Sequence, residues 1–232
     1  MTFLKPNQDR KRIAIIAIYF AMAVDALNIF SVSINYYSLA GGIIPDVMGY
    51  LSYYFDLISG VGQLGITLIV GIIFIMWFRR AYWNLHQLVR HLNHSEGWAA
   101  GSWFVPILSL FRPYQIMQEL WLETPRYLKK HDVNPAKTAA DVPLGWWWAT
   151  FITSSILSNI SGRLYLRSDD LGLYEGAIIT DYISTGLSLI SGYLVLKIMD
   201  GYHELEQQLQ QLDHNNTTQE PQKPDSFVNY RS

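Results

Sequence analysis

An aspartate inside a long apolar stretch is the residue of this sequence best placed to do chemistry. Asp25 lies near the middle of residues 13–36, and Asn28 lies three residues later on nearly the same helix face. A carboxylate at bilayer depth costs about 2.5–3.5 kcal/mol, so it must face a helix bundle, face water, or be protonated. Asp25 is therefore either a proton or cation site, or a neutral acid hydrogen-bonded to Ser, Thr or Asn side chains of residues 144–162.

A second group of candidates lies in a Trp-, Pro- and Gly-rich stretch near the centre of the chain. The guanidinium of Arg112 could hold an anionic headgroup or a substrate carboxylate. The alternative is a structural ion pair between Arg112 and Glu119 that fixes a turn. The candidate residues of this motif are Trp98, Trp103, Pro106, Arg112, Pro113, Tyr114 and Glu119.

Three histidines superficially form a histidine box. His86, His91 and His94 are separated by five and three residues, whereas helical metal sites place histidines on one face, for instance at i and i+4. The sequence contains no Walker loop, GxGxxG, GxSxG or HExxH motif. We therefore expect no metal and no cofactor, and a metal-dependent membrane enzyme is the least favoured alternative.

The composition indicates that membrane helices position these residues. Half of the 232 residues are hydrophobic and 16% are charged, against about 25% charged in soluble domains. The 8 Trp and 15 Tyr are amphipathic rings that favour the lipid–water boundary. A net charge of −2 gives no case for nucleic-acid binding. The absence of Cys from the sequence excludes disulfides and iron–sulfur clusters.

Four stretches approach the roughly 20 apolar residues that a membrane-spanning helix needs. They are residues 13–36, 57–78, 144–162 and 176–198. The third carries several hydroxyl groups, which are tolerated where they bond to their own backbone or to a neighbouring helix. In the fourth, Asp181 is interpreted as a boundary charge. Ser184, Ser188 and Gly192 recur every four residues, which favours close helix packing.

Lys and Arg are concentrated in alternate connections between the expected spans. Connections rich in Lys and Arg stay in the cytoplasm. Residues 1–12 and 79–143 are rich in Lys and Arg, whereas residues 37–56 contain none. The predicted localisation is a bacterial cytoplasmic (inner) membrane, with a multi-pass chain and both termini in the cytoplasm.

Two alternatives concern the number of spans. Residues 13–23 resemble a signal peptide that ends in a small-residue cleavage site, but the apolar stretch continues beyond Ala23. Residues 98–111 could form a fifth span. However, this run is only 14 residues long and contains Pro106, so an interfacial or re-entrant segment is favoured. A fifth span would also move the following Lys and Arg residues outside.

The segment that follows Pro113 has the pattern of an amphipathic helix. Pro is well suited to the first turn of a helix. The residues Ile116, Met117, Leu120 and Trp121 share one face. We expect this helix to lie in the plane of the membrane interface, with Lys129 and Lys130 reaching anionic headgroups.

These motifs carry a family resemblance. The stretches 77–85 (WFRRAYWNL), 97–107 (GWAAGSWFVPI) and 110–121 (LFRPYQIMQELW) resemble the bacterial membrane family catalogued as domain of unknown function 4328. The motif region that contains them, residues 77–121, covers about a fifth of the chain, and the similarity extends over all four spans at the level of hydropathy. The resemblance implies a bacterial multi-span membrane protein and implies no activity.

The sequence thus predicts an all-α polytopic membrane protein. A cytoplasmic segment 1–12 precedes a four-helix membrane domain 13–200, in which residues 79–143 form an amphipathic or re-entrant segment. Residues 201–232 form a polar, largely disordered tail. Its heptad-like stripe of Tyr202, Leu205, Leu209 and Leu212 is a weak indication of a homo-oligomer.

The function expected from these features is that of a non-enzymatic membrane module. It would lie in the lipid bilayer and bind a protein partner or lipid. The alternative is a small transporter, or a proton- or cation-coupled protein, that uses Asp25.

Overall fold

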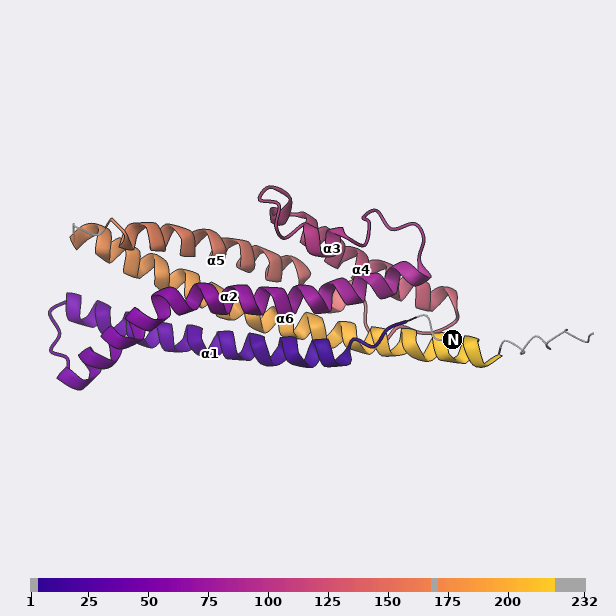
Figure 1. The fold of residues 1–232 in the computed structure, drawn as a ribbon, viewed down its shortest axis with the longest axis horizontal. Helices are drawn as coiled ribbons and strands as arrows, with labels where there is room; N and C mark the ends of the chain where they lie inside the picture. Colours follow the sequence, from indigo (N-terminus) through magenta and orange to yellow (C-terminus); the bar gives the residue numbers. More distant parts are fainter. Residues whose placement is uncertain (1–3, 168–170, 220–232) are drawn as a thin grey trace, which may run out of the picture.

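The structure is a computed structural model that describes residues 4–167 and 171–219. Its long helices are α1 (Gln8–Leu39), α2 (Asp46–Leu88), α5 (Leu144–Tyr165) and α6 (Leu171–Gln219), and they run side by side along the long axis (Figure 1). The connection between α2 and α5 contains α3 (Trp98–Gly101), η1 (Leu108–Leu110), α4 (Arg112–Lys130) and η2 (Ala139–Asp141). The all-helical prediction holds for the described residues.

Three stretches of helix are long and apolar enough to cross a membrane. They are Gln8–Leu39, Gly62–Leu88 and Gly172–Asn215, which correspond to the first, second and fourth expected spans. Helix α5 is not among them, because its Thr, Ser and Asn side chains lower its hydropathy. Length and composition therefore support three spans rather than the four expected.

The outer surface of these helices is apolar. Ile16, Phe20, Leu64 and Leu68 each leave more than half of their surface exposed. Contiguous exposed apolar surface of this extent is typical of helices that face lipid. The chain is thus an all-helical protein with the features of a multi-pass membrane protein.

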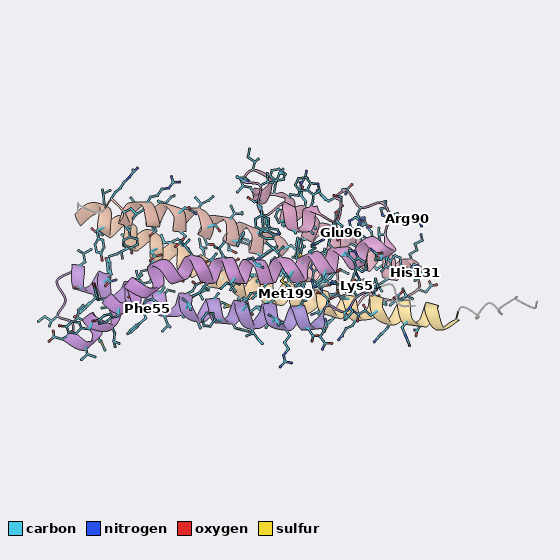
Figure 2. The ribbon with its side chains drawn as sticks, viewed as in Figure 1. Lys5, Phe55, Arg90, Glu96, His131 and Met199 are labelled. Atoms are coloured by element: carbon cyan, nitrogen blue, oxygen red, sulfur yellow. The ribbon has the colours of Figure 1, made fainter. Side chains whose placement is uncertain are left out.

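The start of α1 and the end of α6 lie at the same end of the bundle (Figure 1). Lys5, Arg90, Glu96 and His131 gather toward that end, whereas Phe55 lies near the turn between α1 and α2 (Figure 2). We call the end where α1 starts and α6 ends the terminal end. The Lys and Arg residues that flank α1 and α2 lie toward this end, since residues 13–78 contain neither.

The amphipathic helix α4 packs on the bundle. It begins with Pro113 in its first turn, as predicted. Its apolar face, formed by Ile116, Met117, Leu120 and Trp121, is fully buried. The Trp121 ring lies 6.0 Å from the ring of Tyr202 on α6. The expectation that this face rests on lipid is therefore wrong: the periodicity identified a buried face, and α2 and α6 bury it.

The expected tail begins inside α6, which continues without a break to Gln219. Tyr202, Leu205 and Leu209 are buried within the chain's own core. The stripe that indicated a homo-oligomer is therefore covered by the same chain. The disorder expected for most of residues 201–232 is therefore wrong for residues 201–219, which are helical, and residues 220–232 lie outside the described residues.

The contact between α4 and α6 requires a residue without a side chain at Gly201. A Cβ atom there would lie 2.9 Å from Trp121 Cη2 and 3.2 Å from Lys137 Cδ. We expect Gly201→Leu to lower the free energy of unfolding by about 1–3 kcal/mol, the usual cost of overpacking. The matched control is Gly186→Leu on the same helix, where a Cβ has no neighbour within 4 Å. Unfolding of both variants in detergent micelles measures the difference, and equal stability would contradict this packing.

Candidate functional site

The structure places Asp25 between three helices. Asp25 on α1 is 7% exposed. Gln63 Nε2 on α2 donates to its Oδ1 over 3.1 Å, and Ser188 Oγ on α6 donates to its Oδ2 over 2.7 Å. Of the alternatives that the sequence left open, the structure shows Asp25 facing the interior of the bundle. The expected partners on residues 144–162 are wrong, because α2 and α6, rather than α5, provide the hydrogen bonds.

A second polar contact lies one turn along α1 from Asp25. Asn28 Nδ2 donates to Thr185 Oγ1 over 3.2 Å and to Asp181 Oδ2 over 3.4 Å, both on α6. Asp181, interpreted from the sequence as a boundary charge, therefore faces Asn28 across a helix contact. Further along, Ser33 hydrogen-bonds Tyr182 on α6.

The four-residue repeat on α6 has two different roles. A Cβ at Gly192 would lie 2.9 Å from Met22 Cγ on α1, which agrees with the predicted close approach of another helix. Ser188, however, hydrogen-bonds the Asp25 carboxylate. The prediction that packing alone accounts for this repeat is therefore wrong for Ser188.

Arg112 and Glu119 have different partners in the motif segment. The Arg112 guanidinium lies 4.5 Å from the centre of the Trp98 ring, a cation–π contact. Glu119 accepts hydrogen bonds from Tyr82 Oη at 2.6 Å and from the Asn93 backbone N–H at 2.7 Å. The expected Arg112–Glu119 ion pair is wrong, although Glu119 does fix the turn that precedes α3.

Glu119 joins α2, the following turn and α4. His94 Nδ1 lies 3.1 Å from Glu119 Oε2, and Tyr82 Oη also donates to the His94 carbonyl oxygen. Burial raises the pKa of Glu119, but the hydrogen bonds from Tyr82, Asn93 and His94 outweigh it and hold the pKa below its usual value. The ionised carboxylate is thus the form that this contact stabilises.

Trp103 anchors the segment between α3 and α4 on the bundle. Its ring lies 5.7 Å from Phe74 on α2, and 6.0 Å and 6.1 Å from Trp148 and Phe151 on α5. Trp148 Nε1 donates to the Leu110 carbonyl oxygen over 2.9 Å. Residues 98–111 are helical only at 98–101 and 108–110, so they do not form a fifth spanning helix.

The residues that follow Trp103 point outward. Phe104 and Ile107 are 72% and 73% exposed, and the intervening Val105 and Pro106 are also exposed. This apolar tip, residues 104–107, lies beside the aromatic contacts that Trp103 makes with Phe74 on α2 and with the start of α5.

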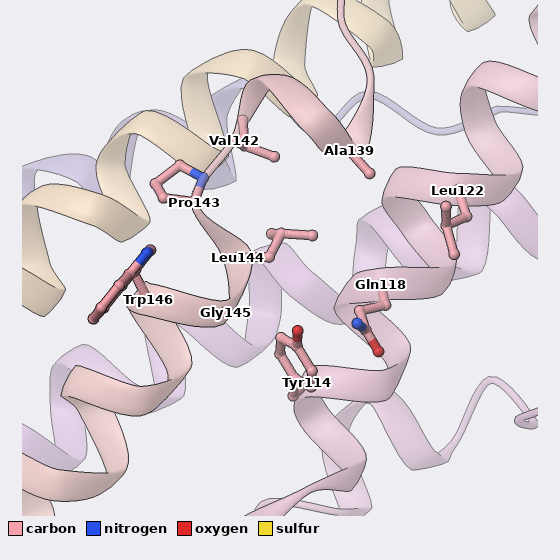
Figure 3. A pocket seen from close by; sticks show the side chains of 9 residues that line it. All are labelled: Tyr114, Gln118, Leu122, Ala139, Val142, Pro143, Leu144, Gly145 and Trp146. Atoms are coloured by element: carbon pink, nitrogen blue, oxygen red, sulfur yellow. The ribbon is translucent and has the colours of Figure 1, made fainter.

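The motif residue Tyr114 lines a cavity of about 320 Å³ between α4 and the start of α5. Figure 3 shows its ring facing the turn at Leu144 and Gly145, with Gln118 beside it. Trp146 lies at the opposite rim and is 73% exposed. The lining is mostly apolar, and the Tyr114 hydroxyl and the Gln118 amide are its polar groups. Pro113, in contrast, is buried at the start of α4.

A buried carboxylate that the sequence reasoning missed lies at the terminal end of the bundle. Glu206 on α6 is 2% exposed. Asn84 Nδ2 donates to its Oε1 over 3.0 Å, and Asn7 Nδ2 lies 3.4 Å from its Oε2. Burial raises the pKa of Glu206 to about 7, although the two amides and the charges of Arg80 and Lys11 lower it. The only signal in the sequence is that Glu206 follows Tyr202 by four residues and so shares its buried face.

The three central histidines have separate partners. His91 Nε2 lies 3.3 Å from Glu123 and His94 Nδ1 lies 3.1 Å from Glu119, whereas the His86 ring packs edge-on against Tyr82. Within residues 4–167 and 171–219, no group of three or more His, Asp or Glu side chains could hold a metal ion.

Comparison with known families identifies the chain's family. The model of the family described as Domain of unknown function (DUF4328) matches residues 47–204, which is more than half of the chain. The protein therefore belongs to this family, which confirms the resemblance carried by the motif stretches. The match begins after α1, so it does not include the first expected span. Neither a curated protein nor a solved structure matches the chain.

The buried Glu206 makes stability depend on pH. Its folded pKa, about 7, lies above the reference value of 4.5. The stability that Glu206 contributes to the folded state is therefore fully present below pH 4.5 and is lost as the pH rises through about 7. We expect wild-type protein in micelles to lose about 3 kcal/mol of unfolding free energy over this interval.

The matched variant is Glu206→Gln, which keeps the shape but cannot ionise. Comparing the two proteins at acidic and mildly alkaline pH isolates the contribution of this side chain. An identical pH dependence in both would contradict the assignment to Glu206.

Proposed function

We propose that this protein is a non-enzymatic, four-span protein of the bacterial cytoplasmic membrane that binds lipid through the apolar tip. Both termini lie in the cytoplasm, and the apolar tip, residues 104–107, inserts into the cytoplasmic leaflet. The packing of Trp103 against Phe74 and Phe151, with Phe104 and Ile107 exposed beside it, is the observation that carries this proposal.

The connectivity supports a fourth crossing by α5. Helix α4 packs near the terminal end of α6, whereas α6 begins near the turn between α1 and α2 (Figure 1). The chain between α4 and the start of α6 therefore connects the two ends of the bundle, and α5 forms this connection beside α6. Its 22 residues span about 33 Å, comparable to the hydrocarbon core of about 30 Å. If α6 crosses the membrane, α5 must cross it too.

The hydroxyl groups of α5 do not oppose this crossing. Thr150, Ser154 and Ser155 each donate to a backbone carbonyl oxygen three or four residues earlier. Asn159 Nδ2 does the same to the Ser155 carbonyl oxygen. Side chains bonded in this way need no water, so their presence is compatible with lipid.

The location of the apolar tip favours lipid as the ligand. Phe74 and Phe151 belong to the expected spans, so the Trp103 ring that packs on them lies at membrane depth. The neighbouring Phe104 and Ile107 side chains then project from the bundle surface into the leaflet. Arg79 and Arg80 follow directly after the second expected span, where they can attract lipid phosphates.

The orientation can be tested because the sequence contains no Cys. Ile43→Cys, at an exposed position in the α1–α2 turn, should react with a membrane-impermeant maleimide in cells whose outer membrane is permeabilised. Arg90→Cys, at the opposite end of the bundle (Figure 2), should react only after the inner membrane is opened. Reaction of both under the same condition would refute the topology.

The lipid contact is tested by nitroxide labels in proteoliposomes. Labels at Phe104→Cys and Ile107→Cys should be relaxed more strongly by oxygen, which concentrates in lipid, than by a water-soluble nickel complex. The label at Arg90→Cys should show the opposite preference. If all three labels prefer the nickel complex, the apolar tip lies in water and the proposal fails.

A further inference from the structure

The contacts of Asp25 define a site that the proposed lipid binding does not use. Its two carboxylate oxygens receive separate hydrogen bonds, from Gln63 on α2 and from Ser188 on α6. These donors come from different helices, so the carboxylate lies where α1, α2 and α6 meet. Both donors are neutral and leave the charge of an ionised Asp25 uncompensated.

The sequence contains no basic side chain at this depth. Residues 13–78, 144–162 and 176–196 contain neither Lys nor Arg. A buried carboxylate in an apolar medium needs a counter-charge, or else a proton that removes its charge. One carboxylate balances one positive charge, so the ligand that suits Asp25 is a monovalent cation.

The surroundings of Asp25 differ between its two sides along the bundle. Toward the α1–α2 turn lie the contacts of Asn28 with Thr185 and Asp181, followed by the Ser31–Ser52 hydroxyl pair. Toward the terminal end, the buried positions of α1 are Ile18 and Ala14, and Met22 packs over Gly192. Along α1, a polar ligand therefore meets hydrogen-bonding groups on the side of the turn and apolar side chains on the other side.

We propose that Asp25, Gln63 and Ser188 form a site for an exchangeable monovalent cation, a proton or Na⁺. The ligand enters from the end of the bundle that carries the α1–α2 turn, past Asn28 and Thr185. Binding neutralises the carboxylate where the three helices meet and so favours their close packing. This inference is independent of lipid binding at the apolar tip.

Infrared difference spectroscopy of the whole protein in lipid nanodiscs tests the site. The spectrum of Asp25→Asn is subtracted from that of the wild type, which isolates the Asp25 carboxyl. The amide of the variant keeps the size of the side chain and can still accept a hydrogen bond from Ser188. The matched control is Asp46→Asn, which removes an exposed carboxylate at the start of α2. The Asp46 carboxylate band should not shift when Na⁺ replaces choline.

Spectra are recorded over a range of pH, in choline and in Na⁺ buffers. A carboxylic-acid C=O band that disappears as pH rises, equally in both buffers, identifies a proton as the ligand. A carboxylate band that shifts when Na⁺ replaces choline identifies Na⁺. A band that does not respond to either change, whether acid or carboxylate, shows no exchangeable ligand and overturns the proposal.

A second variant tests the direction of entry. Asn28→Leu removes the hydrogen bonds of Asn28 to Thr185 and Asp181, which lie between Asp25 and the α1–α2 turn. The variant leaves Gln63 and Ser188 in place. After a pH or Na⁺ jump, the Asp25 band should respond several-fold more slowly in this variant. Met22→Ala, on the apolar side, should respond at least as fast as the wild type. An unchanged response in Asn28→Leu together with a faster response in Met22→Ala would place the entrance at the terminal end instead.

Discussion

Lipid cannot hydrogen-bond, and this constraint governs the interior of the bundle. Every polar group at membrane depth on the apolar helices α1, α2 and α6 needs a partner within the protein or has to face water. Thr150, Ser154, Ser155 and Asn159 of α5 bond to their own helix, whereas Ser161 of α5 donates to the Ala177 carbonyl oxygen on α6. Asp25 and Asn28 instead bond to neighbouring helices. Hydrogen bonds within one helix make its polar side chains compatible with lipid. Hydrogen bonds between helices instead fix the register of α1 against α2 and α6.

Polar contacts of a different kind hold the terminal end together, where water and charge are available. Glu119 links α2, the turn that follows it and α4. Glu206 links the start of α1 to α2 and α6 through Asn7 and Asn84. These carboxylates differ in pKa because Glu119 accepts several strong hydrogen bonds, whereas burial dominates at Glu206. One contact therefore favours the ionised form and the other favours the protonated form.

The connection between α2 and α5 acts as a single packed unit. Trp103 and Trp121 attach its two halves to the bundle, on α2 and α5 and on α6 respectively. The apolar tip projects between these anchors. This arrangement gives the Trp residues of the central stretch a role, since their rings pack the connection onto the bundle.

Composition and periodicity alone determined the helical class, the apolar spans of α1, α2 and α6 and the buried face of α4, and the motif stretches within residues 77–121 carried the family resemblance. These are local properties, since each depends on the order of residues within one helix or motif. The partners of Asp25, Arg112 and Glu119 and the burial of Glu206 were decided by tertiary structure. Periodicity shows that a face is covered but not by what, so the α4 face was assigned to lipid and the Tyr202 stripe to another chain. Which distant residues meet depends on how the helices pack, and no single stretch of sequence contains that information.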